Sequence, residues 1–379
     1  MKNRHLLEVI VIYKKFKELQ LSTLGMGNMR LPILKTETES HIDKEKAQQI
    51  IDYAMANGVN YYDTAYSYHN GESEIFLGEA LKKYERESYY IATKFNINSN
   101  PDYKAVFKEQ LHRLQTDYID FYLIHALSDN TMQRYIEEGS VDYFIEQKKA
   151  GKIKHLGFST HASINTLEKF LEYTDWDFTQ IQLNYFDWLY SHTKEEYDIL
   201  KKRNLPIIVM EPVRGGRLVS LSEMAEFKLK KAHPDWSMAS WAFRWIKRLS
   251  SVVVVLSGMS DINQIKENIE TFSDELFLTD QEEALLFDAC HTFKKEVSVP
   301  CTSCRYCCND CPVEIDIPEY LNIYNKYRTD GRWYAINALK KAESKGKPQD
   351  CIACGVCTSL CPQDIDVKSV MKELAELQQ

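Results

Sequence analysis

The sequence predicts an α/β protein, a closed (β/α)8 TIM barrel followed by a small, mostly α-helical domain. Two observations lead to this prediction. Short runs of β-forming residues alternate eight times with segments of helical periodicity in the first part of the chain. Nine of the ten cysteines lie between Cys301 and Cys361, so the composition changes beyond about residue 290. The length of 379 residues suits one barrel of about 250 residues with a smaller domain after it.

Eight strands are expected in residues 1–292, the predicted barrel domain, of which residues 1–14 form a tail with no assigned role. They are Ser22–Gly27, Val59–Asp63, Tyr89–Phe95, Ile119–His125, Ile153–Ser159, Thr179–Asn184, Pro206–Glu211 and Val252–Gly258. Helical periodicity fills the segments between them, as in Lys44–Asn57, where Gly58 follows at a position that commonly ends a helix. Because repeated βα units build a parallel barrel, its chemistry is expected at the carboxyl ends of the strands.

The composition excludes several classes of protein. A formal net charge of −8 disfavours nucleic-acid binding, for which clustered Lys and Arg are expected. No run approaches the roughly 20 apolar residues of a membrane span. Leu6–Tyr13 resembles a signal segment, but it contains Glu8 and is followed by lysines instead of a small-residue cleavage site. We therefore expect a cytoplasmic protein with no nucleic-acid or membrane partner, whose cysteines form no disulfide framework.

Four polar residues stand at or just after three successive strand ends. Asp63 ends the second expected strand, Tyr68 follows it by five residues, Lys94 lies near the end of the third strand, and His125 ends the fourth. Each alone has an ordinary structural explanation, but together they suit proton donation to a carbonyl group. An ammonium lowers the pKa of a nearby phenol, which is otherwise about 10, and a carboxylate keeps that ammonium charged. An imidazole hydrogen bond polarises the carbonyl while the phenol supplies the proton.

Several segments carry a specific family resemblance over about residues 15–290. They include Tyr62–Tyr68 (YDTAYSY), Ile91–Lys94 (IATK), Thr116–His125 (TDYIDFYLIH), Gly157–His161 (GFSTH) and Met210–Gly216 (MEPVRGG). In order, spacing and strand placement they resemble the aldo/keto reductase superfamily, whose members are TIM barrels that reduce aldehydes and ketones with NADPH or NADH. The resemblance implies a small carbonyl or alcohol substrate and Tyr68 as general acid, in a tetrad with Asp63, Lys94 and His125.

The same resemblance implies a set of cofactor-binding residues. Ser159 and Gln180 would hold the nicotinamide carboxamide, with Met210 against the nicotinamide ring. Arg214, Gly215 and Gly216 would lie over the pyrophosphate, and Glu267 with Asn268 would bind the adenine. Gln264 occupies the position where the family usually has a cation for the 2′-phosphate of NADP, although Lys266 is close in sequence. The choice between NADPH and NADH therefore stays open.

Residues 293–379 contain two cysteine groups of the same spacing. Cys301, Cys304, Cys307 and Cys311 fit C-x2-C-x2-C-x3-C-P, and Cys351, Cys354, Cys357 and Cys361 fit it again. In bacterial ferredoxins with two such runs, the fourth cysteine commonly binds the other cluster. We expect two 4Fe-4S clusters. Cluster I would use Cys301, Cys304, Cys307 and Cys361, and cluster II would use Cys351, Cys354, Cys357 and Cys311.

Zinc is the alternative metal, but zinc sites prefer paired C-x2-C knuckles to a triple with a trailing Cys-Pro. Cys290 and Cys308 are left over and are interpreted as small buried residues or free thiols. The similarity of Cys311–Ile317 to Cys361–Val367 extends the repeat. Together with the helical pattern between the motifs, it resembles the ferredoxin-type domain that some microbial aldo/keto reductases carry at the C-terminus.

Three functional hypotheses remain. In the first, a nicotinamide-dependent carbonyl reductase has clusters that exchange electrons with a one-electron donor or acceptor protein, or that sense redox state. In the second, the chain is an electron-transfer protein whose barrel only binds nucleotide or a partner. In the third, the clusters of the reductase are purely structural. The complete set of four polar groups favours the first over the second. No convincing flavin motif is found.

Overall fold

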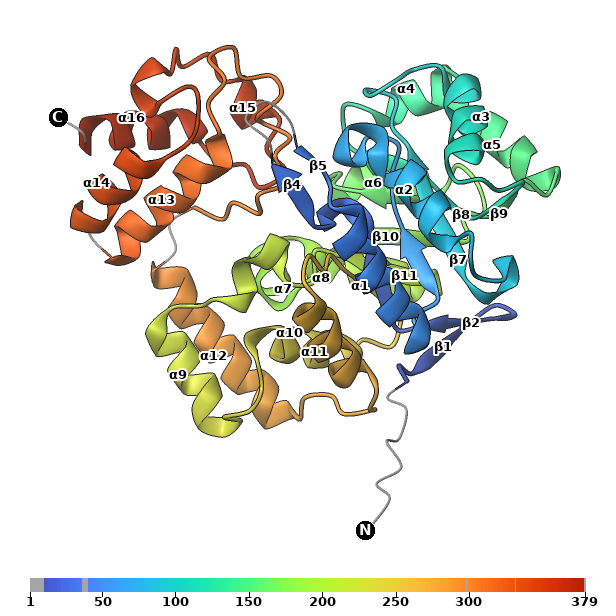
Figure 1. Ribbon diagram of the computed structural model, residues 1–379, viewed down its shortest axis with the longest axis horizontal. Coiled ribbons are helices and arrows are strands. Elements are labelled where there is room, and N and C mark those ends of the chain that lie inside the picture. The colour runs from blue at the N-terminus through green and yellow to red at the C-terminus, as the bar shows by residue number, and fades with distance from the viewer. Residues whose placement is uncertain (1–9, 36–39, 297–298, 331, 378–379) are drawn as a thin grey trace, which may run out of the picture. The chain divides into compact units, whose positions relative to one another are not determined.

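The computed structural model describes residues 10–35, 40–296, 299–330 and 332–377. The chain divides into two compact units (Figure 1). The barrel unit comprises Met1–Pro212 and Ala242–Leu278, and the cluster unit comprises Val213–Trp241 and Thr279–Gln379. The predicted domain boundary at residues 292 and 293 falls inside helix α12 (Asp280–Glu296). The cluster unit also includes a segment that interrupts the barrel sequence, which composition did not indicate.

The barrel unit contains a closed barrel with strand order β10-β11-β12-β3-β6-β7-β8-β9, in which all neighbouring strands are parallel. Its strands are β3 (Leu24–Gly27), β6 (Tyr61–Asp63), β7 (Tyr90–Phe95), β8 (Ile119–Leu127), β9 (Ile153–Thr160), β10 (Phe178–Gln182), β11 (Ile207–Met210) and β12 (Val252–Ser257). The predicted fold class is thus confirmed. Each strand begins and ends within two residues of its expected bounds, a normal scatter for strand ends.

Helices alternate with the strands and surround the barrel (Figure 1). They are α1 (Lys44–Ala56), α2 (Glu72–Leu81), α3 (Tyr103–Arg113), α4 (Met132–Glu137), α5 (Ser140–Lys149), α6 (Ile164–Leu171), α7 (Tyr185–Tyr190), α8 (Thr193–Lys202) and α11 (Ile262–Phe272), while α10 (Met238–Lys247) crosses the unit boundary. At α1, Asp43 caps the first turn by accepting a hydrogen bond from the backbone N–H of Lys46. Gly58, at φ +83°, ends the turn beyond α1 in the left-handed conformation that glycine tolerates best.

Two hairpins were not predicted from the sequence. Strands β1 (Tyr13–Phe16) and β2 (Leu19–Ser22) pair antiparallel, so the expected tail ends inside a strand. Phe16 is buried and packs against Phe121 and His155, with ring centres 5.2 and 5.0 Å away. Both partners lie near the start of their strands, so the hairpin covers the end of the barrel opposite the expected chemistry. A second hairpin joins β4 (Ile33–Lys35) to β5 (Ser40–Ile42).

The cluster unit is helical, as expected. Besides α12 it contains α9 (Glu223–Ala232), α13 (Ile317–Asp330), α14 (Arg332–Lys341), α15 (Val356–Ser359) and α16 (Val367–Leu377). The two cysteine motifs have the same backbone path 50 residues apart. Left-handed residues recur at Ser303 and Ala353, both with φ +56°, and at Glu314 and Asp364, with φ +52° and +49°. The sequence repeat is therefore also a structural repeat.

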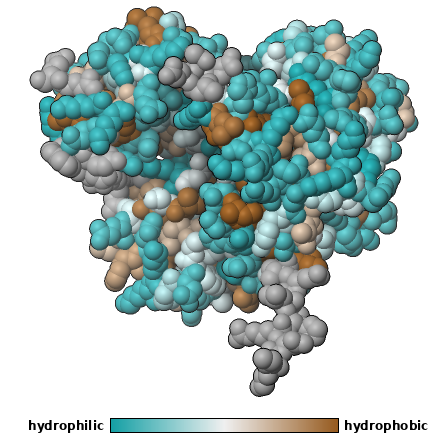
Figure 2. Space-filling view, in the orientation of Figure 1, coloured by the Kyte–Doolittle hydropathy of each residue, from teal (hydrophilic) through white to brown (hydrophobic). Residues whose placement is uncertain are grey.

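One face of the molecule is drawn by residue hydropathy in Figure 2. The face in Figure 2 is mostly hydrophilic, with hydrophobic residues in small separate groups. Among the described residues, no helix combines the length and the apolar character needed to cross a membrane.

Candidate active site and metal centres

Three adjacent strands bring Asp63, Lys94 and His125 to the same end of the barrel. Asp63 is the last residue of β6, Lys94 is the penultimate residue of β7, and His125 lies near the end of β8. Lys94 is fully buried, and its Nζ donates hydrogen bonds to Asp63 Oδ1 at 2.6 Å and to the backbone oxygen of Thr64 at 2.7 Å. The ammonium is therefore fixed in place by two oxygen acceptors.

Tyr68 completes the group from a short 3-10 helix, Tyr68–Gly71, that follows β6. The Nζ of Lys94 lies 5.2 Å from the centre of the Tyr68 ring. The rings of Tyr68 and His125 meet nearly edge to face, with centres 6.0 Å apart. The structure thus brings together all four residues of the predicted tetrad, while their catalytic roles stay predictions.

Burial controls the charges of these groups. It raises the pKa of Asp63 and lowers that of Lys94, and the contact between the two opposes both shifts. Burial, with Lys94 and His161 nearby, holds the pKa of His125 well below its usual range. The imidazole is therefore neutral at pH 7 and can donate one N–H to an oxygen instead of acting as an acid.

A buried network of polar side chains contacts the backbone of Lys94 and the neighbouring Thr93. Glu74 of α2 is fully buried and accepts hydrogen bonds from Thr93 Oγ1 at 2.6 Å and from Gln110 Nε2 at 2.8 Å. Gln110 also donates to the backbone oxygen of Lys94 at 3.0 Å, and Arg113 donates to Glu74 at 3.2 Å. Sequence analysis missed this role. Glu74 lies directly before the apolar residues Ile75, Phe76 and Leu77 of α2, and its sequence position gave no signal that it is buried.

The residues expected at the nicotinamide lie on neighbouring strands. Gln180 of β10 pairs in register with Ser159 of β9, and its Nε2 lies 3.5 Å from the Sδ of Met210 on β11. Ser159 Oγ accepts a hydrogen bond from the backbone N–H of Ala126 at 2.8 Å. Among the described residues, the buried Oε1 of Gln180 has no hydrogen-bond partner. A carboxamide N–H would satisfy this oxygen, so these residues fit the nicotinamide carboxamide.

The residues expected at the adenine end lie on α11. Asn268 is buried and donates to Ser257 Oγ at 3.1 Å, whereas Gln264 and Glu267 are exposed. The Nζ of Lys266 lies 5.7 Å from the centre of the Tyr53 ring on α1. Another cation, Arg30, was not singled out from the sequence.

Arg30 packs against the segment that follows β12. A Cβ built on Gly258 would lie 3.0 to 3.3 Å from the aliphatic atoms of Arg30. In addition, Ser260 Oγ donates to the backbone oxygen of Arg30 at 2.6 Å. A cation 230 residues away in sequence is therefore next to the segment expected to bind the nucleotide phosphate, where the sequence showed none.

The three residues expected over the pyrophosphate belong to the cluster unit. Arg214, Gly215 and Gly216 begin a short helical loop, Arg214–Val219, that follows β11. All three have positive φ, and Arg214 is buried. The guanidinium of Arg214 donates to the backbone oxygen of Pro300 at 3.2 Å and to the side-chain oxygen of Gln363. These residues lie close in sequence to Cys301 and Cys361, two expected ligands of cluster I.

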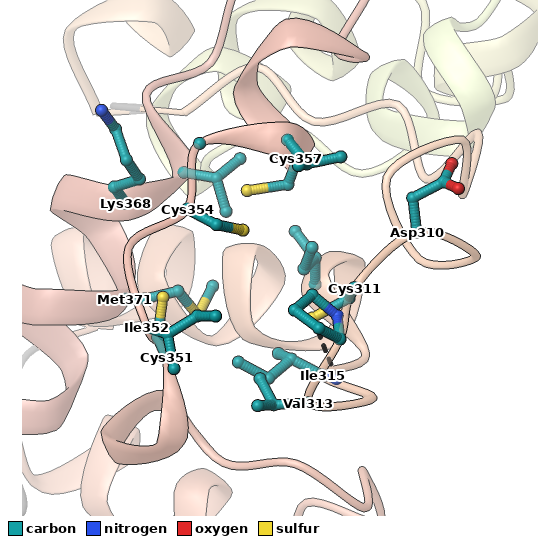
Figure 3. Close-up of a pocket in the computed structure, with 15 residues that line it drawn as sticks. Asp310, Cys311, Val313, Ile315, Cys351, Ile352, Cys354, Cys357, Lys368 and Met371 are labelled. Atoms are coloured by element: carbon teal, nitrogen blue, oxygen red, sulfur yellow. Dashed lines mark hydrogen bonds between the residues drawn. The ribbon is translucent and has the colours of Figure 1, made fainter.

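The ligands expected for cluster II line one small pocket. Figure 3 shows Cys351, Cys354 and Cys357 of the second motif around the same space as Cys311 of the first. The remaining wall is mostly apolar and includes Ile315 and Met371. The crossed assignment of Cys311 thus agrees with the arrangement of the four thiols.

Cysteines expected to bind cluster I are likewise neighbours. Burial raises the pKa of the Cys301 thiol to about 11, and the nearby thiols of Cys304 and Cys361 act in the same direction. The Sγ of Cys301 also accepts a hydrogen bond from the backbone N–H of Ser303 at 3.4 Å. Because a ligand must be a thiolate, cluster assembly at this buried thiol releases a proton. Cys361, from the second motif, therefore lies with cysteines of the first.

A single zinc ion would need a close set of thiols. Tetrahedral zinc with Zn–S bonds of about 2.3 Å needs sulfur atoms about 3.8 Å apart. Within the described part of the chain, no three His, Cys, Asp or Glu side chains are placed to hold one metal ion. Four cysteines that line one pocket fit a multi-iron cluster.

Family models match both parts of the chain. Residues 23–290 match the aldo/keto reductase family. The chain belongs to this family. Residues 300–365 match the 4Fe-4S dicluster domain, so this aldo/keto reductase family member is an oxidoreductase with an iron–sulfur domain.

Similar proteins cover the barrel portion well. An uncharacterized oxidoreductase of Bacillus subtilis is 26% identical over 298 residues, which cover 70% of this chain and 91% of the relative. The NADH-specific methylglyoxal reductase of Escherichia coli is 23% identical over 308 residues, covering 68% and 92%. The holo form of an aldo-keto reductase from Bacillus halodurans superposes with a TM-score of 0.61 at 27% identity, covering 74% of this chain and 96% of that one.

Proposed function

We propose that this protein is an NAD(P)H-dependent carbonyl reductase. The observation that carries the proposal is the buried Lys94, which is held by Asp63 and Thr64 and lies near the ring of Tyr68. The Tyr68 ring in turn meets the ring of His125 nearly edge to face. A site that only bound nucleotide would not need a fixed ammonium, a phenol and a neutral imidazole at three adjacent strand ends.

The chain's own residues have distinct roles in this proposal. Ser159, Gln180 and Met210 would hold a nicotinamide, which when bound would supply a hydride to the carbonyl carbon. The Tyr68 hydroxyl donates its proton to the carbonyl oxygen, so that an aldehyde or ketone becomes an alcohol. Lys94 stabilises the phenolate that Tyr68 leaves behind, and Asp63 keeps Lys94 charged. Neutral His125 donates a hydrogen bond to the carbonyl oxygen and orients the substrate.

An anaerobic assay of the cluster-loaded protein against a panel of aldehydes and ketones tests the proposal. We expect NADH and NADPH to support reduction with kcat/KM values within about tenfold of each other. Gln264 supplies no cation for the 2′-phosphate and Lys266 lies over Tyr53, whereas Arg30 offers a cation nearby. Consumption of neither nucleotide with any carbonyl would reject the reductase and favour a barrel that only binds nucleotide or a partner.

For the iron–sulfur domain, we propose two 4Fe-4S clusters that exchange electrons with a one-electron protein partner or report redox state. The location of cluster II supports exchange, because its ligand Cys354 is exposed and the adjoining Ile352 is 64% exposed. An apolar surface beside a cluster suits transient docking of a partner.

Removal of iron separates this role from a structural one. After anaerobic chelation we expect nicotinamide-linked carbonyl reduction to persist at half or more of its rate, while the one-electron oxidation of reduced viologen by the protein's clusters stops. The wild-type holoprotein, treated identically without chelator, is the control. Loss of helical circular dichroism together with both activities would instead indicate structural clusters.

A further inference from the structure

The short helical loop after β11 is hydrogen-bonded to the chain beside two expected ligands of cluster I. Arg214, which is only 4% exposed, donates to the backbone oxygen of Pro300 and to the side chain of Gln363. Pro300 directly precedes Cys301, and Gln363 follows Cys361 by two residues. The loop and all of these residues belong to the cluster unit. Arg214 therefore ties the loop to both segments that carry cluster I ligands.

Arg217 is a second cation of this loop. It lines an open cleft of the cluster unit together with Cys301 and Ser303. Burial lowers the pKa of Arg217 and the nearby Cys301 raises it, so the guanidinium and this thiol lie within electrostatic reach. The guanidinium carbon lies 5.5 Å from the centre of the Phe293 ring, and the buried Nε has no hydrogen-bond partner among the described residues. A partly buried cation thus stands beside an expected ligand of cluster I.

The charges of this cleft leave a positive excess. Its charged lining residues are the cations Arg217, Arg305 and Lys326 and the carboxylates Asp316 and Glu319. Arg305 donates to Asp316 at 2.8 Å, so the charges of this pair largely cancel. Three cations against two carboxylates leave one positive charge in excess beside cluster I.

The pocket expected to hold cluster II has no such excess. Its charged lining residues are Asp310 and Lys368, one of each sign. Both residues are exposed, and Figure 3 shows the amine of Lys368 pointing away from the thiols. Apart from these two residues and the cysteines, every described residue that lines the pocket is apolar. The two cluster sites therefore differ in the charge that surrounds them.

Surrounding charge is one of three properties that set the potential of an iron–sulfur cluster, with hydrogen bonds to its sulfurs and solvent exposure. In each site a backbone N–H donates to a ligand sulfur at 3.4 Å, at Cys301 and at Cys311, so these two bonds affect both clusters alike. Water at the exposed Cys354 also stabilises a reduced cluster. Arg217, however, brings a full charge into partly buried surroundings, where Coulomb interactions are stronger than in water.

We propose that Arg217 raises the reduction potential of cluster I above that of cluster II, so that an electron taken up by the cluster unit is held on cluster I. The inference rests on the proposed electron exchange with a one-electron protein partner. That partner supplies the electron, and no covalent bond forms or breaks. The exposed Cys354 makes cluster II the side that the partner approaches.

A redox titration of the full-length, cluster-loaded protein, followed by electron paramagnetic resonance, measures both midpoint potentials. Cys304→Ala leaves cluster II and Cys354→Ala leaves cluster I, so these variants assign the two signals. We expect the potential of cluster I to be higher by at least about 59 mV, which corresponds to a tenfold preference of one electron for cluster I. Equal potentials, or a higher potential for cluster II, would overturn the proposal.

Replacing Arg217 assigns the difference to this side chain. Arg217→Gln should lower the potential of cluster I by about 59 mV, a tenfold change, and should move that of cluster II by less than about 18 mV, a twofold change. Arg217→Lys keeps the charge and should retain at least half of the difference. Arg217→Met keeps a long side chain beside Phe293 and provides the same neutral variant if Arg217→Gln loses iron.

Lys230→Gln is the matched control. It also removes one positive charge from the cluster unit, but Lys230 is an exposed residue of α9 whose Nζ lies 3.9 Å from Glu226. Both cluster potentials should stay unchanged in this variant. An unchanged cluster I potential in the neutral Arg217 variants, or an equal shift in Lys230→Gln, rejects the role of Arg217.

Failure of the proposed electron exchange is recognised separately. If the wild-type protein holds its iron but neither cluster can be reduced, the exchange role fails and this inference fails with it. If both clusters are reduced but their potentials do not depend on Arg217, only the inference is rejected.

Discussion

Replacing Tyr68 with phenylalanine is expected to lower kcat/KM for carbonyl reduction by about 100- to 10,000-fold, the usual contribution of a positioned proton donor. Each of the other groups is less suited to supply the proton. Lys94 is held by Asp63 and Thr64, and the lowered pKa of His125 leaves its ring neutral. The hydroxyl of Tyr68 is therefore the remaining donor. Steady-state kinetics with a carbonyl substrate measure the loss.

Measuring nucleotide affinity should distinguish loss of the proton donor from a disrupted binding site in Tyr68→Phe. Phenylalanine keeps the ring beside His125, so the dissociation constant for NADPH or NADH should change by less than about threefold. Tyr66→Phe is a matched control, because Tyr66 lies in the same segment but donates its hydroxyl to Glu109 at 2.8 Å. Normal reduction by Tyr68→Phe, or an equal loss in Tyr66→Phe, would remove Tyr68 from the proposed role.

Local sequence patterns predicted the barrel, because strand ends follow directly from the order of βα units. The structure brings the four predicted tetrad residues together, while their roles stay predictions. Asp63, Lys94 and His125 needed only adjacent strands to meet. The eight expected cluster ligands could also be found from the sequence, because the spacing of the cysteines within each motif is local. In both cases the signal lies within a short stretch of sequence.

Features that depend on contacts between distant parts of the chain could not be predicted from local sequence patterns. The hairpin β1–β2 is identified by its packing on residues of β8 and β9, and not by a strong pattern of its own. The pairing of Arg214 with Gln363 joins residues 149 positions apart. Polar contacts of this kind leave no periodic signal, so the sequence could assign Arg214 only the nucleotide role implied by family resemblance.

The crossed ligand pattern predicts a large and specific loss of iron. Cys361→Ala should reduce the iron content from about eight to about four atoms per chain, because it removes a ligand of cluster I, although the first motif keeps all its cysteines. The crossed pattern is based on two observations. Cys361 lies near Cys301, and Cys311 lines the pocket formed by the second motif. Iron analysis and electron paramagnetic resonance of anaerobically purified protein measure the loss. Cys308→Ala, which changes a cysteine outside both sets, should retain both clusters.

Double variants distinguish crossed from sequential ligation. If Cys361 and Cys304 bind the same cluster, the double alanine variant loses no more iron than either single variant and keeps about four atoms per chain. If Cys361 and Cys354 bind different clusters, their double variant loses both. Sequential ligation predicts the reverse, with complete loss in the first double variant and partial loss in the second. Because the two arrangements differ in which pair is non-additive, the result does not depend on how stable either cluster is alone.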